Sequence, residues 1–207
     1  MSYTTGQGIA RTTTSALDSF IAAVDKVAAA EADDRRVVAS VCAHLGPLLR
    51  DANWLAPQFR EPWQDRYRPH LVAVAPSRRF SVMSLVWLPR QMTPIHDHRC
   101  WCVVGVLQGV EREQRFSLRE DDEGAQWLAP VGDDLVRVGQ VSQLIPPEEN
   151  IHQVRNAGAD LAISVHVYGA DLSLHLSSIN RCFDDLVVRD GPLGGHGVSW
   201  RPVNSIQ

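Results

Sequence analysis

Apolar residues are spaced differently before and after about residue 70 of the chain. In the first part they recur every three or four positions in two groups, which predicts two amphipathic helices. The first group is Leu17, Phe20, Ile21, Val24, Val27 and Ala28, and the second is Val37, Val38, Val41, Leu45, Leu48 and Leu49. Asp33 and Asp34 precede the second group, where an aspartate commonly caps a helix. Gly46 and Pro47 disturb this helix, so the pattern leaves its end open.

The second part of the chain contains short runs rich in β-branched and aromatic residues, separated by turn residues. These runs cover residues 71–74, 80–88, 100–107, 111–118, 126–128, 135–138, 140–145 and 161–168. Such a succession predicts a mainly β fold, a small antiparallel barrel or jelly roll. A chain of 207 residues is long enough for one buried core, so we expect a single domain over residues 1–207. Residues 1–66 are expected to form a helical region packed on the barrel.

Composition and charge narrow the class of protein. The formal net charge is -4, and basic and acidic residues are nearly balanced, which argues against a nucleic-acid binder, because such a protein needs a basic face. The first residues carry no charged region followed by an apolar core, and no apolar run is long enough to cross a membrane. We therefore expect a cytoplasmic protein with reduced thiols at Cys42, Cys100, Cys102 and Cys182. The sequence leaves the oligomeric state open.

The strongest chemical signal is the segment His96-Asp97-His98 together with a third histidine, His152, far downstream. On a β-strand, residues two apart point to the same face, so both imidazoles of the pair can reach one ion. Neutral imidazole suits iron, zinc, nickel or copper better than magnesium or calcium. We therefore predict that these three histidines bind one metal ion.

The surroundings of these histidines resemble the two motifs of the cupin superfamily. In the first motif a histidine pair is followed by a glutamate and then by a glycine that closes a hairpin; here Gly109 is that glycine, and Cys102 occupies the glutamate position. The second motif is similar to residues 147–156, which include His152, although Glu149 stands where glycine is usual. The resemblance implies a cupin barrel whose metal has three histidine ligands and no carboxylate ligand.

Three histidines with cysteine in the glutamate position resemble the thiol dioxygenases, a family that includes cysteine dioxygenase and bacterial 3-mercaptopropionate dioxygenase. Ser164, His166 and Tyr168 are similar to the Ser-x-His-x-Tyr triad of that family, and their spacing puts them on one strand face. The resemblance implies Fe(II) as cofactor, dioxygen as co-substrate and a sulfinic acid as product. It also implies an acid–base and oxygen-positioning role for Tyr168, with His166 and Ser164 behind it. A half-buried strand with a polar outer face would account for the same alternation.

Cys102 has two interpretations. It is either a small buried apolar residue, as most cytosolic cysteines are, or the partner of Tyr168 in a thioether. The second interpretation comes from the resemblance, because mammalian-type cysteine dioxygenases have a crosslinked cysteine at this position. Parity along the two strands predicts that the side chains of Cys102 and Tyr168 are neighbours.

The substrate-binding end departs from the family pattern. Pro69 stands where cysteine dioxygenases have an arginine and the mercaptopropionate branch has a glutamine. We expect Tyr67 and Arg68 to contact the substrate, with Arg181 as a second cationic candidate, because a guanidinium group matches a carboxylate. Solvation at the surface explains the two arginines equally well. A small thiol carboxylate is therefore predicted as substrate, with 3-mercaptopropionate or a related acid slightly preferred to cysteine.

Two other functions remain open at this stage. Three histidines and a water also make a catalytic zinc site, so the cupin could use zinc, nickel or manganese for a hydrolytic or isomerase reaction. Alternatively, it could bind a ligand without catalysis, although the Ser164-His166-Tyr168 triad would then have no purpose. Metal analysis and oxygen uptake in the presence of thiols separate these possibilities.

Overall fold

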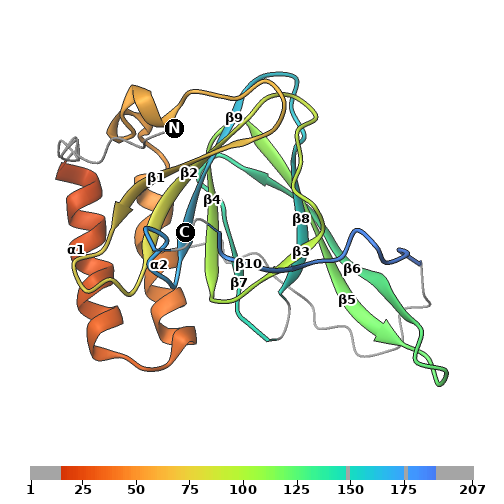
Figure 1. The fold of residues 1–207 in the computed structure, drawn as a ribbon. Helices are drawn as coiled ribbons and strands as arrows, with labels where there is room; N and C mark the ends of the chain where they lie inside the picture. Colours follow the sequence, from red (N-terminus) through yellow and green to blue (C-terminus); the bar gives the residue numbers. More distant parts are fainter. Residues whose placement is uncertain (1–14, 148–149, 175–176, 190–207) are drawn as a thin grey trace, which may run out of the picture.

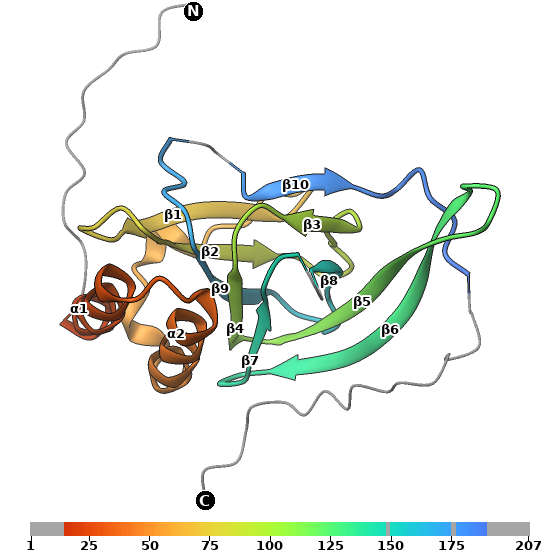
Figure 2. The same cartoon turned by 90° about the horizontal axis from the view of Figure 1, so that it is seen from below.

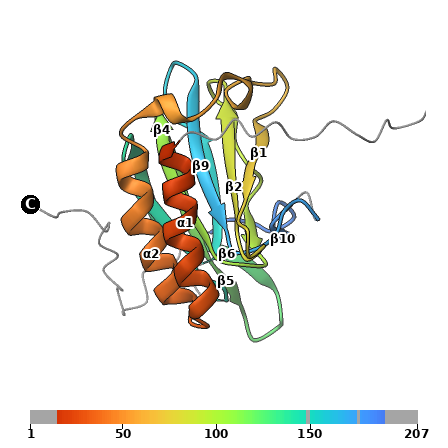
Figure 3. The ribbon, with the colours of Figure 1, turned by 90° about the vertical axis from the view of Figure 1, so that its left-hand side faces the viewer.

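The computed structural model describes residues 15–147, 150–174 and 177–189. The chain begins with two α-helices, α1 (Ser15–Ala30) and α2 (Asp34–Leu48), which pack side by side on one face of a β-sheet (Figures 1 and 3). Asp33 caps α2, as predicted, and its side chain accepts a hydrogen bond of 2.9 Å from the backbone N–H of Arg35. The helix continues through Pro47 to Leu48, which resolves the end that the sequence left open. Two short 3-10 helices, Ala52–Trp54 and Pro57–Phe59, then lead to the first strand.

The remaining elements form two five-stranded sheets that face each other (Figure 2). The first sheet has the strand order β1-β2-β9-β4-β7, and the second has the order β10-β3-β8-β5-β6. The strands are β1 (Arg68–Val74), β2 (Ser81–Trp87), β3 (His96–His98), β4 (Cys102–Gln108), β5 (Val110–Glu120), β6 (Gln126–Arg137), β7 (Val141–Leu144), β8 (Ile151–Asn156), β9 (Ala162–Tyr168) and β10 (Ile179–Cys182). Neighbouring strands within the sheets run antiparallel.

The first sheet is buried on both faces, which explains the long apolar runs of β2, β4 and β9. Alternate residues of these strands, such as Val82, Val103 and Val165, pack with the apolar sides of α1 and α2. The other residues, such as Met83 and Val104, point between the two sheets. The helices therefore cover the outer face, and the inner face is left to line the barrel.

Close contacts at two glycines fix the position of β4. A Cβ at Gly105 would lie 2.3 Å from Cδ1 of Leu49, so the glycine leaves room for the Leu49 side chain at the end of α2. Gly109 has φ of 79°, a left-handed conformation that favours glycine, and it connects β4 to β5. This is the glycine that the sequence predicted at the end of a hairpin.

Some strands differ from the sequence prediction. The runs 126–128 and 135–138 belong mostly to one strand, β6, which continues through Pro130 and Gly132 because a bulge at Val131, between them and opposite Arg115 and Phe116, absorbs the irregularity. Strands β3, β8 and β10 were not among the predicted runs, although the prediction for the His96–His98 pair assumed a strand there. Within the described residues, no helix is both long and apolar enough to cross a membrane. For the glycine-rich segment 191–195 the sequence leaves open both a cover over the barrel mouth and a free terminus; this segment and residues 1–14 lie outside the described residues.

Candidate metal centre

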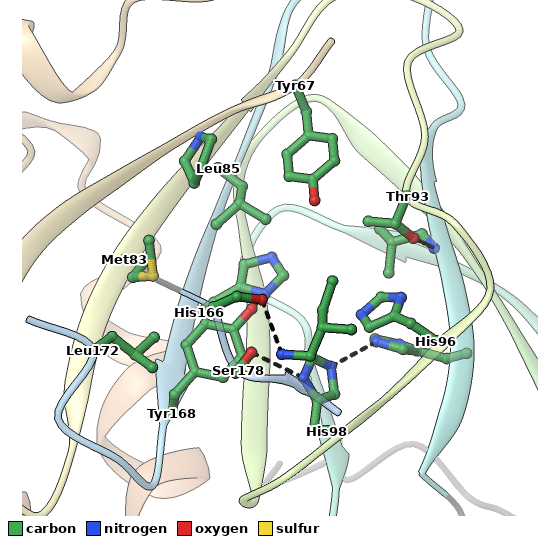
Figure 4. Close-up of a pocket in the computed structure, with 15 residues that line it drawn as sticks. Tyr67, Met83, Leu85, Thr93, His96, His98, His166, Tyr168, Leu172 and Ser178 are labelled. Carbon is green, nitrogen blue, oxygen red and sulfur yellow. Dashed lines mark hydrogen bonds between the residues drawn. The ribbon is translucent and has the colours of Figure 1, made fainter. Parts of the chain in front are cut away.

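The three predicted ligands meet between the two sheets (Figure 4). His96 and His98 point inward from β3, and His152 lies opposite His96 on the neighbouring strand β8. All three side chains are buried, and their ligand atoms lie within 4.8 Å of one another. The alternation along β3 thus places the pair on one face, and the strand pairing supplies the third ring.

Each ring has a hydrogen-bond partner at the nitrogen that faces away from the centre. The Nδ1 atom of His96 lies 2.9 Å from the carbonyl oxygen of Pro94, and that of His98 lies 3.0 Å from Oγ of Ser178. The Nδ1 atom of His152 lies 2.8 Å from Oε1 of Glu113. The carbonyl oxygen and the carboxylate can only accept, so the Nδ1–H of His96 and of His152 donates to them, and the lone pair of each ring is on Nε2, the atom that a metal would bind. The Ser178 hydroxyl can accept from the Nδ1–H of His98 in the same way.

The distances and protonation of the rings suit a transition metal. The Nε2 atoms of His98 and His152 are 3.0 Å apart. Two imidazoles bound at right angles, each about 2.1 Å from one ion, would be separated by about 3.0 Å. Burial, followed by the neighbouring His152, lowers the pKa of His96 to about 3 and that of His98 further, so both rings are neutral donors. The donor set therefore fits iron, zinc, nickel or copper.

Glu113 on β5 anchors the third ligand and belongs to a buried polar cluster. Arg115 donates hydrogen bonds to Glu113 at 3.2 Å and to Ser142 at 2.7 Å, and the Ser142 hydroxyl also donates to Glu113. Burial acts to raise the pKa of Glu113, but Arg115, His152 and Ser142 together lower it to about 2. An ionised carboxylate thus holds the His152 ring and increases its basicity toward a metal.

The predicted Ser-His-Tyr triad runs along β9 toward the three histidines. Oγ of Ser164 lies 2.9 Å from Nε2 of His166, and Nδ1 of His166 lies 3.0 Å from the hydroxyl of Tyr168. The rings of Tyr168 and His98 have centroids 5.5 Å apart. The Tyr168 hydroxyl also bonds to the side chain of Ser178, and burial raises its pKa well above the usual value. Tyr168 is therefore an un-ionised phenol beside the candidate metal centre.

Cys102 and Tyr168 are direct partners in the pairing of β4 with β9. The Cys102 side chain is fully buried, and its thiol is hydrogen bonded to the Tyr168 side chain. Burial raises the pKa of this thiol well above its usual value, so it is not a thiolate. The structure brings the two side chains together, as parity along the strands had predicted.

A cavity of about 70 Å³ opens next to the three histidines. Tyr67, Thr93, Tyr168, Ser177 and Ser178 supply hydroxyl groups to its wall, and Met83, Leu85 and Leu172 supply apolar surface. Figure 4 shows the Tyr67 hydroxyl pointing into this cavity. Among the described residues that line it there is no arginine, lysine, aspartate or glutamate. A small molecule with few polar atoms suits such a space.

The residues predicted to bind substrate separate into two groups. Tyr67 and Pro69 line the cavity, and Tyr67 stacks on Trp87 with centroids 4.6 Å apart. Arg68 lies between them on the alternating strand and turns away: its guanidinium group bonds to Glu61 at 3.1 Å. Arg181 is exposed on β10, with its guanidinium carbon 4.5 Å from the centroid of Phe183. The structure places neither guanidinium group in the cavity wall.

Two residues that hold the rings, Glu113 behind His152 and Ser178 behind His98, were not predicted from the sequence. Residues 111–115 are all charged or polar, so no apolar alternation marks an inward face in the sequence. In the structure Glu111, Glu113 and Arg115 are nevertheless buried, contrary to the usual position of charged residues. Ser178 lies between β9 and β10 and has no motif of its own.

Comparisons with known proteins give one family match and several similarities to solved structures. A family model described as cysteine dioxygenase type I matches residues 13–180. Among solved structures, the protein TT1209 from Thermus thermophilus is 20% identical with a TM-score of 0.39, and the alignment covers 55% of this chain and 91% of that chain. An uncharacterized conserved protein with a double-stranded β-helix domain from Klebsiella pneumoniae is 15% identical with a TM-score of 0.41, covering 58% and 88%. Oxalate decarboxylase from Bacillus subtilis is 18% identical with a TM-score of 0.40, covering 54% and 28%. Together with the two facing sheets, the family match confirms the predicted cupin barrel with N-terminal helices.

Proposed function

Since the chain belongs to the cysteine dioxygenase type I family, we propose that it is an iron(II) thiol dioxygenase acting on a small thiol carboxylate. The observation that carries the proposal is the convergence of three Nε2 atoms beside the Tyr168 hydroxyl. Three neutral imidazoles would leave a bound divalent ion with its full charge and with room for further ligands. Such a centre can accept an anionic sulfur donor together with a second small molecule.

The overall reaction adds dioxygen to a thiol: R–SH + O2 gives R–SO2H, a sulfinic acid, with both oxygen atoms on sulfur. Iron(II) held by His96, His98 and His152 would lower the pKa of the substrate thiol and activate dioxygen. The protein contributes the orientation of the rings through Pro94 and Glu113. The apolar part of the cavity wall excludes water from the reacting sulfur.

Tyr168 holds a proton next to the reacting atoms. Its hydroxyl lies 3.0 Å from Nδ1 of His166 and also bonds to Ser178, so it can position an oxygen atom or supply a proton without leaving the chain of hydrogen bonds. His166 and Ser164 fix the direction of that hydroxyl. These roles are the ones that the family resemblance implied.

The wall of the cavity favours a mercapto acid over an aminothiol. No acidic side chain is among its described residues, so an amine would lose its water without gaining a charged partner. A carboxylate, in contrast, can accept hydrogen bonds from hydroxyl groups, of which Tyr67 is the one opposite the histidines. We therefore propose 3-mercaptopropionate or a related acid as the substrate, ahead of cysteine and cysteamine.

The test is a measurement of oxygen uptake by iron-loaded protein with 3-mercaptopropionate, mercaptosuccinate, cysteine and cysteamine. We expect the mercapto acids to be consumed fastest, with one dioxygen per thiol and a sulfinic acid as product. Uptake by the zinc-loaded protein should be absent. A protein that is purified with zinc and hydrolyses or isomerises a substrate, or that binds thiols without oxygen uptake, would contradict the proposal.

Two variants test how the carboxylate is held. Tyr67→Phe removes a hydroxyl that lines the cavity, and we expect it to raise the KM for 3-mercaptopropionate by roughly tenfold, the effect of one lost hydrogen bond to a charged group. Arg68→Ala is the matched control on the neighbouring residue, whose guanidinium group is bonded to Glu61, and we expect its KM to be unchanged. A larger effect of Arg68→Ala than of Tyr67→Phe would show that Arg68, and not Tyr67, binds the substrate carboxylate.

A further inference from the structure

Strand β5 carries a second buried glutamate that the proposed reaction does not use. Glu111 lies two residues before Glu113, on the same inward face, and its side chain is 1% exposed. The carboxyl group lies beside the side chains of Ser164 and Trp87, and the Nε1–H of Trp87 donates to Oγ of Ser164 at 3.1 Å. Its Oε1 atom has no hydrogen-bond partner, which is costly for a buried carboxylate but much less so for a neutral acid.

We infer that Glu111 is a positioning residue: as an un-ionised acid, it orients the hydrogen-bond chain Ser164–His166–Tyr168 so that the Tyr168 proton points into the cavity. The inference rests on the proposed thiol dioxygenase function for its consequence in catalysis. Its geometric basis is the continuous series of contacts from Glu111 to Ser164, from Ser164 to His166 at 2.9 Å and from His166 to Tyr168 at 3.0 Å.

The surroundings of Glu111 keep its proton on. Burial and the negative charge of nearby Glu113 raise the pKa of Glu111, to about 8, and they outweigh the opposing effect of Ser164 and Trp87, which would favour the carboxylate. Glu113, by contrast, is ionised because Arg115 stabilises its charge. Two glutamates on one strand face thus have pKa values moved in opposite directions, a pattern that commonly separates an acid from a base.

A neutral Glu111 determines which group donates in each hydrogen bond of this series. The Nε1–H of Trp87 donates to Oγ of Ser164 at 3.1 Å, and the acid proton of Glu111 occupies the second lone pair of that oxygen. Ser164 must then donate its own proton to Nε2 of His166, which leaves the His166 proton on Nδ1. Nδ1–H donates to the Tyr168 oxygen, so the phenol proton is free for Ser178 or for a bound molecule.

Ionisation of Glu111 would exchange donor and acceptor in every hydrogen bond of this series. Ser164 would donate to the carboxylate, His166 would carry its proton on Nε2, and Tyr168 would donate to Nδ1 of His166 and away from the cavity. The groups that face Glu111 are Glu113 on its own strand, Trp87 on β2 and Ser164 on β9, and beyond Ser164 lies His166, whose pKa is lowered to about 3 by burial and by His152. Of these, Glu111 is the group that changes charge near neutral pH.

Infrared spectroscopy tests the protonation of Glu111 without any catalysis. The difference spectrum between wild type and Glu111→Gln should contain the C=O band of an un-ionised carboxylic acid at about pH 6, and this band should disappear with a midpoint near pH 8. Glu120→Gln, the same change at an exposed position of β5, is the matched control and should leave the band unchanged. Absence of the band at about pH 6 would overturn the inference.

The pH profile of thiol oxidation tests the coupling to Tyr168. Wild-type kcat should fall by roughly tenfold above about pH 8, the usual effect of a lost supporting partner, whereas Glu111→Gln and Ser164→Ala should show no such fall. Ser164→Ala keeps the infrared band but breaks the chain, so it serves even where Glu111→Gln folds poorly. Coincident profiles of wild type and both variants would overturn the role of Glu111 while leaving the dioxygenase function intact. If no thiol is oxidised, the proposed function fails, and the infrared band still decides whether Glu111 carries the proton.

Discussion

Tyr168 lies beside the three histidines without being one of the converging metal donors. Tyr168→Phe removes its hydroxyl but no ring, so we expect turnover to fall by about 10- to 100-fold while bound metal stays at the wild-type level. Steady-state kinetics with elemental analysis of the same samples makes the comparison. An unchanged kcat in the phenylalanine variant would remove Tyr168 from the proposed mechanism.

Glu113 should act on the metal through His152. Its carboxylate accepts the Nδ1–H of that ring at 2.8 Å, which fixes the tautomer in which Nε2 is a donor. We expect Glu113→Gln to weaken metal binding by about 10- to 100-fold, because the amide keeps the shape of the side chain but not its charge. Competition with a chelator of known affinity measures the change. Glu120→Gln, at the exposed end of the same strand, should bind metal as the wild type does.

The raised pKa of Glu111 also makes stability depend on pH. An unfolded glutamate ionises at about 4.5, whereas the folded one ionises at about 8, so its contribution is complete below pH 4.5 and is lost as the pH rises toward 8. Wild type should therefore lose stability relative to Glu111→Gln across this window, by about 1.4 kcal/mol for each pH unit as an upper bound. Denaturant unfolding at several pH values tests this. Parallel pH dependences of the two proteins would contradict it.

At the level of strands, the pairing of β4 with β9 determines which side chain lies next to Cys102. Because Cys102 and Tyr168 are cross-strand partners, we expect a thioether to form between Sγ and the tyrosine ring during aerobic turnover with iron. The thiol and the ring each lose one hydrogen, and dioxygen accepts the two electrons and two protons. Peptide mass spectrometry should detect a linked pair lacking two hydrogens.

The crosslink prediction has its own control. Cys100 lies two residues away and is half-buried, so Cys100→Ala should retain the linked peptide, whereas Cys102→Ala should lose it. Separate Cys102 and Tyr168 peptides after many turnovers would leave Cys102 as an ordinary core residue.

Strand parity also determines how much of the site the sequence could predict. The His96–His98 pair and the Ser164–Tyr168 triad each have a period of two, so spacing placed each set on one strand face, and the family resemblance identified the triad. Glu111 and Glu113 follow the same period, but an inward charge is recognised only when its buried partners are known, and those come from β8 and β9. Arg68 is absent from the cavity wall for a related reason. It is the neighbour of Tyr67 and Pro69, which line the cavity, and adjacent residues of a strand point to opposite faces.

For the molecule as a whole, the spacing of apolar residues predicted the two helices and most strands, because each helix has one apolar side and most strands are apolar or alternating runs. It did not predict how distant strands pair. β8 pairs with β3 but lies more than 50 residues later in the chain. Its inward residues include His152 and Asn156, which interrupt the apolar pattern. The position of the metal centre therefore depends on long-range pairing that local sequence does not encode.

A metal bound by the three histidines would connect β3 and β8 of the second sheet, so metal binding should stabilise the whole fold. A ligand that binds only the folded state at 100 times its Kd adds about 2.7 kcal/mol, which for a chain of this size raises Tm by roughly 5–10 °C. We expect iron(II), added without oxygen, to raise the Tm of the wild type by this amount and that of His96→Ala far less. His96 suits the test because its outer partner is a backbone carbonyl, so its removal leaves no buried carboxylate unpaired. His44→Ala, an exposed histidine on α2, controls for unspecific binding and should keep the full shift. An equal shift in His96→Ala and wild type would mean that iron binds elsewhere, and the three-histidine centre would lose its role.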